Sequence, residues 1–318
     1  MRQITLSVVA PVYCEGGHLH EFVAALVGVL DPLHDQTGLD YEIMLVDDGS
    51  TDNTWSAMRA LTDQYTCLRC LRLSRNFGKD AALSAGLEAA NGDAVITMDS
   101  DMQHPASLIP EMVALWRTGD VDVVDVRKQE RQAESLLSRI CAVSFYRIFR
   151  FLTSYDLKGS GDFKLLDRKV VDAWKALGER KLFYRGLTSW MGFRHQELLF
   201  TPCLRCGGCS KWSLARRITL AVDSMISFSG KPLLIIGIIT LFFYALSFIV
   251  GCEALWSYAT GQAHSGFTTV ILLILLTGSA ILTGLCILSA YIHHAFIELK
   301  GRPRYLLAET VESSATEA

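Results

Sequence analysis

The residues best suited to chemistry lie in a short acidic segment, Asp99-Ser-Asp101-Met-Gln103-His-Pro, which follows an apolar stretch at 93–98. Two carboxylates two residues apart in a turn can share one hard cation, and oxygen ligands suit Mg²⁺ or Mn²⁺. Such an ion can also bridge a diphosphate. A pair of this kind standing alone is more often an acidic surface turn or the cap of a helix.

Three other polar, sharply turned segments could join this acidic cluster. Each follows a stretch with the character of a strand, and they are Pro11–Gly17, Asp47–Asp52 and Ser74–Lys79. In the second segment, Asp48 could accept hydrogen bonds from a nucleobase or ribose, and Gly49 would allow a ligand to approach closely. The same segment could instead start a helix, with Ser50 or Thr51 as its N-cap.

Strands and helices alternate along the first 100 residues. Strands are expected at 4–12, 41–47, 67–73 and 93–98, and helices at 18–30, 51–62 and 79–91. This alternation predicts an α/β fold, a mainly parallel sheet with helices on both faces. Ligands of such sheets bind beyond the carboxyl ends of the strands, so we expect the four polar segments to meet at one edge.

The chain has 318 residues, of which 50% are hydrophobic, with a net charge of −3 and a mean hydropathy of +0.27. The apolar excess lies in two uncharged stretches, 233–250 and 267–292, each long enough to cross a bilayer as a helix. Lys and Arg flank both stretches but are absent from 251–266, which places the N-terminal part in the cytoplasm. The slightly acidic balance argues against nucleic acid as a partner.

Several weaker patterns lie outside these segments. Two amphipathic stretches, 134–152 and 212–229, could pack on a core or lie in the membrane interface, and for the second we favour the interface. The polar end of the chain, 309–318, is predicted to be disordered. The series Cys67-x-x-Cys70 and Cys203-x-x-Cys206-x-x-Cys209 could bind zinc, but we expect reduced thiols in a cytoplasmic protein.

Taken together, the four polar segments resemble those of the inverting family 2 glycosyltransferases, which have a Rossmann-like GT-A fold. They occur in that family's order, as PVYCE, DDGSTDNT, LSRNFGK and DSDMQHP. The resemblance continues to about residue 306 through GDFKLL from Gly161, ERKLFYRG from Glu179, RCGGCSKW from Arg205, SFSGKPL from Ser227 and KGRPRY from Lys300. The whole series is similar to the polyprenyl-phosphate glycosyltransferases, specifically the bactoprenol glucosyltransferase branch related to dolichol-phosphate mannose synthase.

This resemblance implies a role for residues of each block. The donor-binding residues would be Pro11, Tyr13, Glu15, Asp48, Lys79, Asp99, Ser100 and Arg127. Asp101 and Gln103 would hold the divalent ion, Mg²⁺ or Mn²⁺. The catalytic residues would be Asp162, Asp101, Lys211 and Arg205, with Asp162 near the anomeric carbon of the sugar.

The chain departs from the family pattern at a few positions. Cys14, His104, Lys164 and Trp212 stand where the family usually has Asn, Asp, Arg and Tyr. Lys164 keeps the positive charge of an arginine but loses the bidentate fork. Because the predicted metal cluster and Asp162 are intact, we still expect activity.

The sequence therefore predicts four regions. These are a cytoplasmic GT-A domain at 1–210, a juxtamembrane amphipathic helix at 211–230, two transmembrane helices within 231–294 (about 232–254 and 267–292), and a cytoplasmic tail at 295–318. The predicted activity is inverting transfer of a hexose, glucose from UDP-glucose, to undecaprenyl phosphate for modification of a surface glycan. The enzyme would act at the cytoplasmic face of a bacterial inner membrane, and the resemblance implies a homo-oligomer, a tetramer.

The sequence also allows another donor, but it fits other classes of function less well. The donor could be GDP-mannose or another nucleotide sugar. A processive polysaccharide synthase would need several channel-forming helices and a Gln-x-x-Arg-Trp motif, and the sequence has neither. A non-catalytic scaffold or donor-sugar sensor would not need the intact acidic cluster, and two spans without an intramembrane ion pair are a poor transporter.

Overall fold

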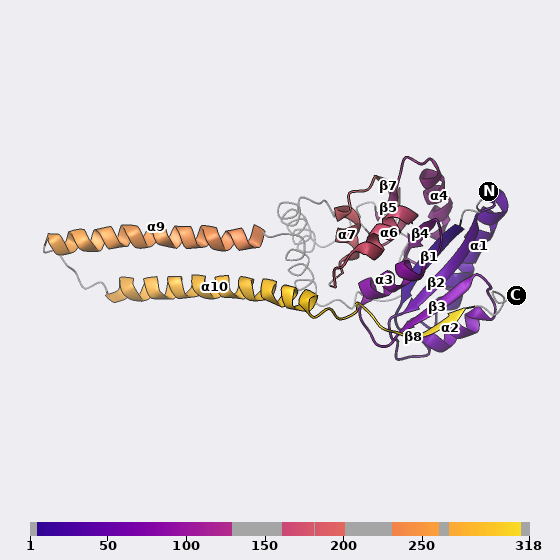
Figure 1. Cartoon of the computed structure of the whole chain (residues 1–318), viewed down its shortest axis with the longest axis horizontal. Helices are drawn as coiled ribbons and strands as arrows, with labels where there is room; N and C mark the ends of the chain where they lie inside the picture. Colours follow the sequence, from indigo (N-terminus) through magenta and orange to yellow (C-terminus); the bar gives the residue numbers. More distant parts are fainter. Residues whose placement is uncertain (1–4, 129–160, 181, 201–230, 261–266, 313–318) are drawn as a thin grey trace. The chain divides into compact units, whose positions relative to one another are not determined.

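In this computed structural model, the described residues are 5–128, 161–180, 182–200, 231–260 and 267–312 (Figure 1). They fall into two compact units. The first contains 5–128, 161–180, 182–200 and 302–312, and the second contains 231–260 and 267–301. The amphipathic stretches predicted at 134–152 and 212–229, the series from Cys203 to Cys209, and the predicted site residues Arg205 and Lys211 lie outside the described residues.

Eight strands of the first unit form one mixed sheet, in the order β7-β5-β6-β4-β1-β2-β3-β8. Their bounds are β1 Thr5–Val12, β2 Asp40–Asp47, β3 Leu68–Leu73, β4 Ala94–Thr97, β5 Val123–Lys128, β6 Lys164–Asp167, β7 His195–Phe200 and β8 Leu307–Glu312. Strands β3, β2, β1 and β4 are parallel neighbours, and β7 is parallel to β5. Strands β6 and β8 pair antiparallel with their neighbours. The predicted parallel sheet is therefore confirmed for β1 to β4, and the strands on either side of these four make the whole sheet mixed.

Helices cover both faces of this sheet, as predicted. The main core joins one face of β1, for example Leu6 and Val8, to α1 (Leu19–Thr37), α2 (Thr54–Thr62) and α4 (Ile109–Arg117), which follows the short 3-10 helix η1 (Ala106–Leu108). On the other face, α3 (Lys79–Ala89) packs on β1 and β2 and contacts α6 (Arg168–Ala176). Because both faces are covered, β1 is buried continuously from Leu6 to Val12 and not at alternate residues.

Helix α1 is longer than the predicted span of 18–30. It continues through Pro32 and ends at Thr37, and Gly38 caps it with φ of 64° and an N–H donated to the His34 carbonyl oxygen. The buried side chain of Leu33 continues the apolar stripe beyond residue 30. A proline inside the stripe made the sequence look as if the helix stopped early, because proline usually ends a helix.

The prediction of a disordered end at 309–318 is wrong for residues 309–312, which belong to β8. This strand pairs antiparallel with β3, and the Arg69 guanidinium lies 2.7 Å from the Glu312 carboxylate. Trp55 Nε1 donates to the Glu309 carboxylate at 3.0 Å. An edge strand has one solvated side, so its side chains are polar and its composition resembles that of a disordered tail.

The segment before β8 is also bonded to the first unit. Arg304 donates to the carbonyl oxygens of Leu177 and Glu179, the second at 2.8 Å, and its guanidinium lies 3.2 Å from the Glu88 carboxylate. The Tyr305 hydroxyl donates a hydrogen bond to the same carboxylate at 2.7 Å. The chain after the second unit is therefore attached to α3, the helix that contains Glu88.

The described residues of the second unit form two long apolar helices, α9 (Lys231–Ala259) and α10 (Phe267–Leu299). Within them, Ile236–Glu253 and Leu273–Leu299 have mean hydropathies of 2.0 and 2.1, and no residue of either window is buried. By length and composition both helices can cross a membrane. They coincide with the two predicted hydrophobic segments, and α10 runs on beyond the predicted end at 292.

Gly86 sets how closely α3 approaches the sheet. A Cβ atom at this position would lie 2.2 Å from Val9 Cγ1 and 3.1 Å from Val46 Cγ2. We expect Gly86→Ala to cost about 1–3 kcal/mol of stability through overpacking, which a lower midpoint of thermal unfolding would reveal. Gly28→Ala is the matched control, because Gly28 lies at an exposed position of α1 and a Cβ atom there would meet nothing within 4 Å. This variant should raise stability by up to about 1 kcal/mol. Equal midpoints for the two variants would contradict this packing.

Candidate active site

The predicted polar segments meet at the carboxyl ends of the parallel strands. Ser100 Oγ lies within hydrogen-bonding distance of the Pro11 carbonyl oxygen, at 2.9 Å, and of the Glu15 carboxylate. The backbone N–H of Cys14 donates to Ser50 Oγ at 2.9 Å. These contacts join the segments after β1, β2 and β4 into one edge, as the alternation of strands and helices predicted.

The Asp48 carboxylate joins the fourth segment to this edge. It accepts hydrogen bonds from the backbone N–H groups of Phe77 and Gly78, at 2.8 and 3.0 Å. Gly49 has φ of 67°, and a Cβ atom there would lie 2.3 Å from the carbonyl carbon of Arg75, so only glycine allows this approach of the two loops. Burial raises the pKa of the Asp48 carboxyl, although the two N–H donors oppose that rise. Asp48 therefore holds the loop after β3 in place.

Glu15 faces the acidic segment after β4. Burial raises its pKa, and the charges of Asp101 and Asp99 raise it further, while the hydrogen bond from Ser100 lowers it. Tyr13, just beyond β1, has an exposed ring. Glu15 and Ser100, predicted to bind the donor from the segments after β1 and β4, thus lie beside one another.

Asp101 and Gln103 lie on the same side of a turn. Met102 between them has φ of 56°, and the backbone N–H of Gln103 donates to Asp101 Oδ1 at 3.1 Å. Gln103 Nε2 lies 2.6 Å from Asp101 Oδ2, and the Asp101 side chain is exposed. The two side chains predicted to hold a divalent ion are therefore adjacent and open to solvent.

These two side chains fit a metal whose other ligands come from the substrate and water. Within the described ranges, no three His, Cys, Asp or Glu side chains gather as ligands for a metal. Mg²⁺ is usually bound through one or two carboxylates together with substrate phosphates, so a larger protein cage is not required. Gln103 would offer its amide oxygen to the ion, which requires the amide group to turn over from its present contact with Asp101.

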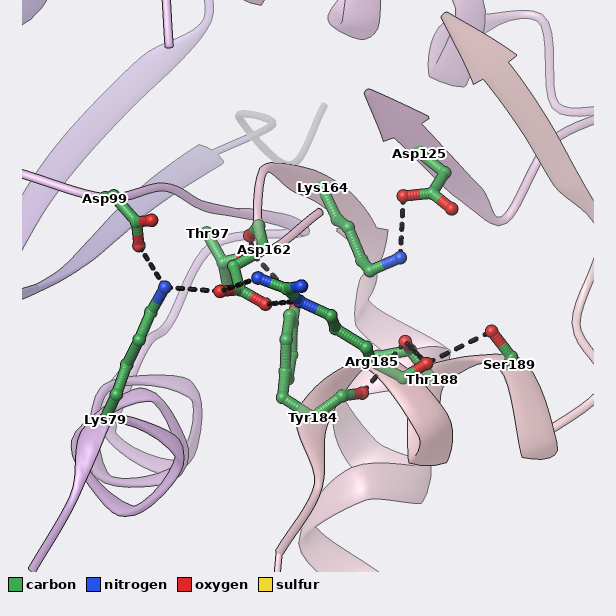
Figure 2. A network of polar contacts seen from close by, with 10 residues as sticks. All are labelled: Lys79, Thr97, Asp99, Asp125, Asp162, Lys164, Tyr184, Arg185, Thr188 and Ser189. Carbon is green, nitrogen blue, oxygen red and sulfur yellow. Dashed lines mark hydrogen bonds and ion pairs between the residues drawn. The ribbon is translucent and has the colours of Figure 1, made fainter. Parts of the chain in front are cut away.

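The carboxylate of Asp162 lies at the centre of a network of ion pairs (Figure 2). Arg185, on α7 (Tyr184–Trp190), forms a bidentate ion pair with this carboxylate. Its Nε lies 2.6 Å from Oδ1 and its Nη2 lies 2.9 Å from Oδ2. Lys79, the first residue of α3, contacts Asp162 Oδ2 and lies 2.5 Å from Asp99 Oδ1. Thr97 Oγ1 donates to the backbone carbonyl of Asp162 at 2.6 Å. Asp162 is therefore fixed through its side chain and its backbone.

In this network the Asp162 carboxylate is more deeply buried than the two cations that contact it. The Asp162 side chain is 6% exposed, whereas those of Lys79 and Arg185 are 39% and 42% exposed. Burial opposes ionisation of Asp162, but Arg185 and Lys79 hold its pKa well below the usual range. Burial likewise tends to lower the pKa of Lys79, but Asp99 and Asp162 raise it overall. Asp162 and Lys79 are therefore both ionised at neutral pH.

A second, fully buried ion pair lies beside the first network. Lys164 Nζ is 2.7 Å from Asp125 Oδ1, and both side chains are almost completely buried. Burial lowers the pKa of Lys164, while the Asp125 carboxylate opposes that change. Arg127, predicted to bind the donor, lies on the same strand as Asp125 and pairs with Glu197 of β7 at 3.1 Å.

The sequence analysis assigned no role to Arg185. This residue lies in the block ERKLFYRG, which carried part of the family resemblance, but nothing in the spacing showed that it reaches Asp162. The same is true of Thr97 and Tyr184, whose hydroxyl oxygens lie 2.7 Å apart behind the Asp162 backbone. The signal available for Arg185 was its place in this block, which contains three cations and had no assigned function.

Comparison with known proteins identifies the family. Residues 7–174, slightly more than half of the chain, match the sequence model described as Glycosyl transferase family 2. The chain is 38% identical over 315 residues to an uncharacterized glycosyltransferase of Synechocystis, covering 96% of this chain and 95% of the relative. It is 32% identical over 307 residues to the SfII prophage-derived bactoprenol glucosyl transferase of Shigella flexneri, covering 96% and 98%.

The chain also aligns with solved structures. A mannosyltransferase from Pyrobaculum calidifontis, determined in complex with GDP-Man and Mn²⁺, aligns with 93% of this chain and 86% of its own, with a TM-score of 0.49 and 18% identity. Both the match to the family model and the identity to full-length relatives are independent of that alignment. The chain therefore belongs to glycosyl transferase family 2, and it is a glycosyltransferase.

Proposed function

We propose that this glycosyltransferase moves a hexose, glucose from UDP-glucose, to undecaprenyl phosphate or another polyprenyl phosphate with inversion of the anomeric carbon. The observation that carries this proposal is the similarity, over 96% of the chain, to a protein named bactoprenol glucosyl transferase. Two apolar helices that can cross a membrane support a lipid acceptor, because one substrate would then be dissolved in water and the other held in the bilayer.

The chemistry of the acceptor fits the charge state of the site. A monoester phosphate is already anionic at neutral pH, so its oxygen can attack without first losing a proton. The new bond joins that oxygen to the anomeric carbon, and the bond from the anomeric carbon to the UDP oxygen breaks. UDP leaves with the electron pair, and attack opposite the leaving group inverts the anomeric carbon. No strong general base is required.

Residues of the acidic edge would hold the donor. Asp101 and Gln103 would bind the divalent ion, Mg²⁺ or Mn²⁺, which when bound stabilises the negative charge on the leaving diphosphate. Pro11, Tyr13, Glu15, Asp48, Lys79, Asp99, Ser100 and Arg127 would line the donor site. Arg205 and Lys211 would meet phosphate, and Asp162 would lie near the transferred sugar.

The proposal includes the place of action. The excess of Lys and Arg on the flanks of the two apolar helices supports a cytoplasmic catalytic unit in a bacterial inner membrane, with both helices spanning it. The regions 1–210, 211–230, 231–294 and 295–318 and a homo-oligomeric state belong to the same proposal. The product would supply a reaction that transfers sugar from a lipid phosphate to a surface glycan.

Transfer can be tested directly on membranes that contain the full chain. We expect label from radioactive UDP-glucose, in the presence of undecaprenyl phosphate and Mg²⁺, to enter a lipid fraction that mild acid releases. Parallel incubations with UDP-galactose and GDP-mannose identify the donor, and membranes lacking the protein are the control. Label from GDP-mannose alone would replace the donor in this proposal, and no label from any donor would overturn it.

Removal of the Asp101 carboxylate tests the metal assignment. We expect Asp101→Asn to lower kcat/KM by about 10²–10³, because one charged ligand of the leaving-group stabiliser is lost. The Mg²⁺ concentration that gives half-maximal activity should rise as well. Asp120→Asn is the matched control, since Asp120 is an exposed acid in the turn after α4. An unchanged Mg²⁺ dependence in Asp101→Asn would show that Asp101 does not bind the ion.

Protease accessibility tests the proposed orientation. Trypsin added to sealed inside-out vesicles should digest the first unit, because that unit would face the medium. Right-side-out vesicles should protect it until detergent is added, as followed with an antibody to the N-terminal unit. Digestion in intact right-side-out vesicles would contradict the cytoplasmic placement.

A further inference from the structure

In the Asp162 network the two cations are the most exposed charged side chains, while the Asp99 side chain is 25% exposed. Lys79 and Arg185 are 39% and 42% exposed, while the Asp162 side chain between them is 6% exposed. Both carboxylate oxygens of Asp162 are already engaged, Oδ1 by Arg185 and Oδ2 by Arg185 and Lys79. The Lys79 and Arg185 side chains are therefore more accessible to a molecule arriving from water than the Asp162 carboxylate between them.

Both cations are held in place before any substrate arrives. The fork of Arg185 is fixed by two hydrogen bonds of 2.6 and 2.9 Å, and the Lys79 ammonium lies between Asp162 and Asp99 (Figure 2). Asp162 is itself held through its carbonyl oxygen by Thr97. Fixed donors of this kind stabilise an anion without the cost of reorganising at the moment of reaction.

The same contacts make Asp162 a poor proton acceptor. A general base needs a lone pair directed at the substrate and a pKa near the working pH. Here the oxygens point at two cations of the chain, and those cations hold the pKa of Asp162 well below its usual range. Of the other charged groups of the network, Lys164 and Asp125 pair with each other, and Asp99 pairs with Lys79.

We propose that Lys79 and Arg185 form a phosphate subsite of the transferase, and that Asp162 is the buried counter-anion that positions them. This inference rests on the proposed function, in which a donor diphosphate and a lipid monophosphate both enter the site. Either could supply the phosphate, since the recognising chemistry is the same. Arg185 would bind through N–H groups of its planar guanidinium, and Lys79 as a point charge.

The experiment measures phosphate binding without turnover. The full chain in detergent is titrated with Mg²⁺–UDP and, separately, with undecaprenyl phosphate. We expect Arg185→Gln to weaken binding of one of the two by about tenfold or more, as the loss of hydrogen bonds to a charged group implies. The weakened ligand identifies the source of the phosphate. Arg185→Lys should bind with intermediate strength, because it keeps the charge and loses the fork.

A matched control comes from a second arginine fork in the same unit. Arg194 pairs with Asp122 in the same way, with Nη2 2.8 Å from Oδ1 and Nε 3.2 Å from Oδ2, and it is not part of the Asp162 network. Arg194→Gln should therefore leave both affinities within about twofold of the unmodified protein. If Arg185→Gln also binds both ligands like the unmodified protein, or if the unmodified protein binds neither, the proposed subsite is wrong.

The role of Asp162 is tested separately. If Asp162 positions the cations, Asp162→Asn should weaken binding of the same ligand as Arg185→Gln, and the double variant should be little worse than either single variant. A large loss of kcat with both affinities unchanged would instead show that Asp162 acts in the transfer step and not in phosphate binding, and would overturn the proposal. These affinities do not depend on sugar transfer, so failure of the transfer assay with an intact Arg185 effect would refute the proposed function alone.

Discussion

The shared carboxylate of Asp162 is the contact on which the geometry of the site depends. It joins α3 through Lys79, the start of β6 through its own backbone, and α7 through Arg185. These segments are distant in sequence, because Lys79 and Asp162 are 83 residues apart. Removing Lys79 or Arg185 would leave the buried Asp162 carboxylate less well compensated, which is destabilising. The network therefore fixes the relative positions of three elements as well as three charges.

The sheet explains why this contact is possible. Thr97, at the end of β4, pairs with Lys164 of β6 in an antiparallel register, and that pairing brings Asp162 beside the acidic segment after β4. On the neighbouring strands, the loops after β2 and β3 are joined by Asp48 and by the close approach at Gly49. Parallel strands thus supply the edge, and a single antiparallel strand brings the central anion to it.

Much of the fold and part of the site were predictable from sequence. The first four strands and their helices were predicted because apolar runs and polar turns alternate there with regular lengths. The acidic and glycine-containing segments were predicted to meet because the ends of parallel strands share one edge. The contacts of Ser100 with Glu15 and of Cys14 with Ser50 agree with that expectation.

The rest depended on contacts that sequence patterns do not encode. Strand β8 was missed because an edge strand with exposed Glu side chains has the composition of a tail, and its pairing partner β3 lies more than 200 residues away. Arg185 was missed because its partner is fixed by the tertiary fold and not by spacing. The last seven residues of α1, 31–37, were not predicted because Pro32 usually marks the end of a helix, although the buried Leu33 continues the apolar stripe.

The C-terminal segment links the apolar helices to the helix that carries Lys79. α10 ends at Leu299, and a few residues later Arg304 and Tyr305 bind Glu88 near the end of α3, whose first residue is Lys79. Residues 307–312 then add β8 to the sheet edge. A chain that returns from a candidate membrane span in this way is held to the catalytic unit by both side-chain and ladder hydrogen bonds. Helix α3 is thus contacted near both ends, at Glu88 by Arg304 and Tyr305 and at Lys79 by Asp99 and Asp162, so the C-terminal segment and the Asp162 network bind the same helix.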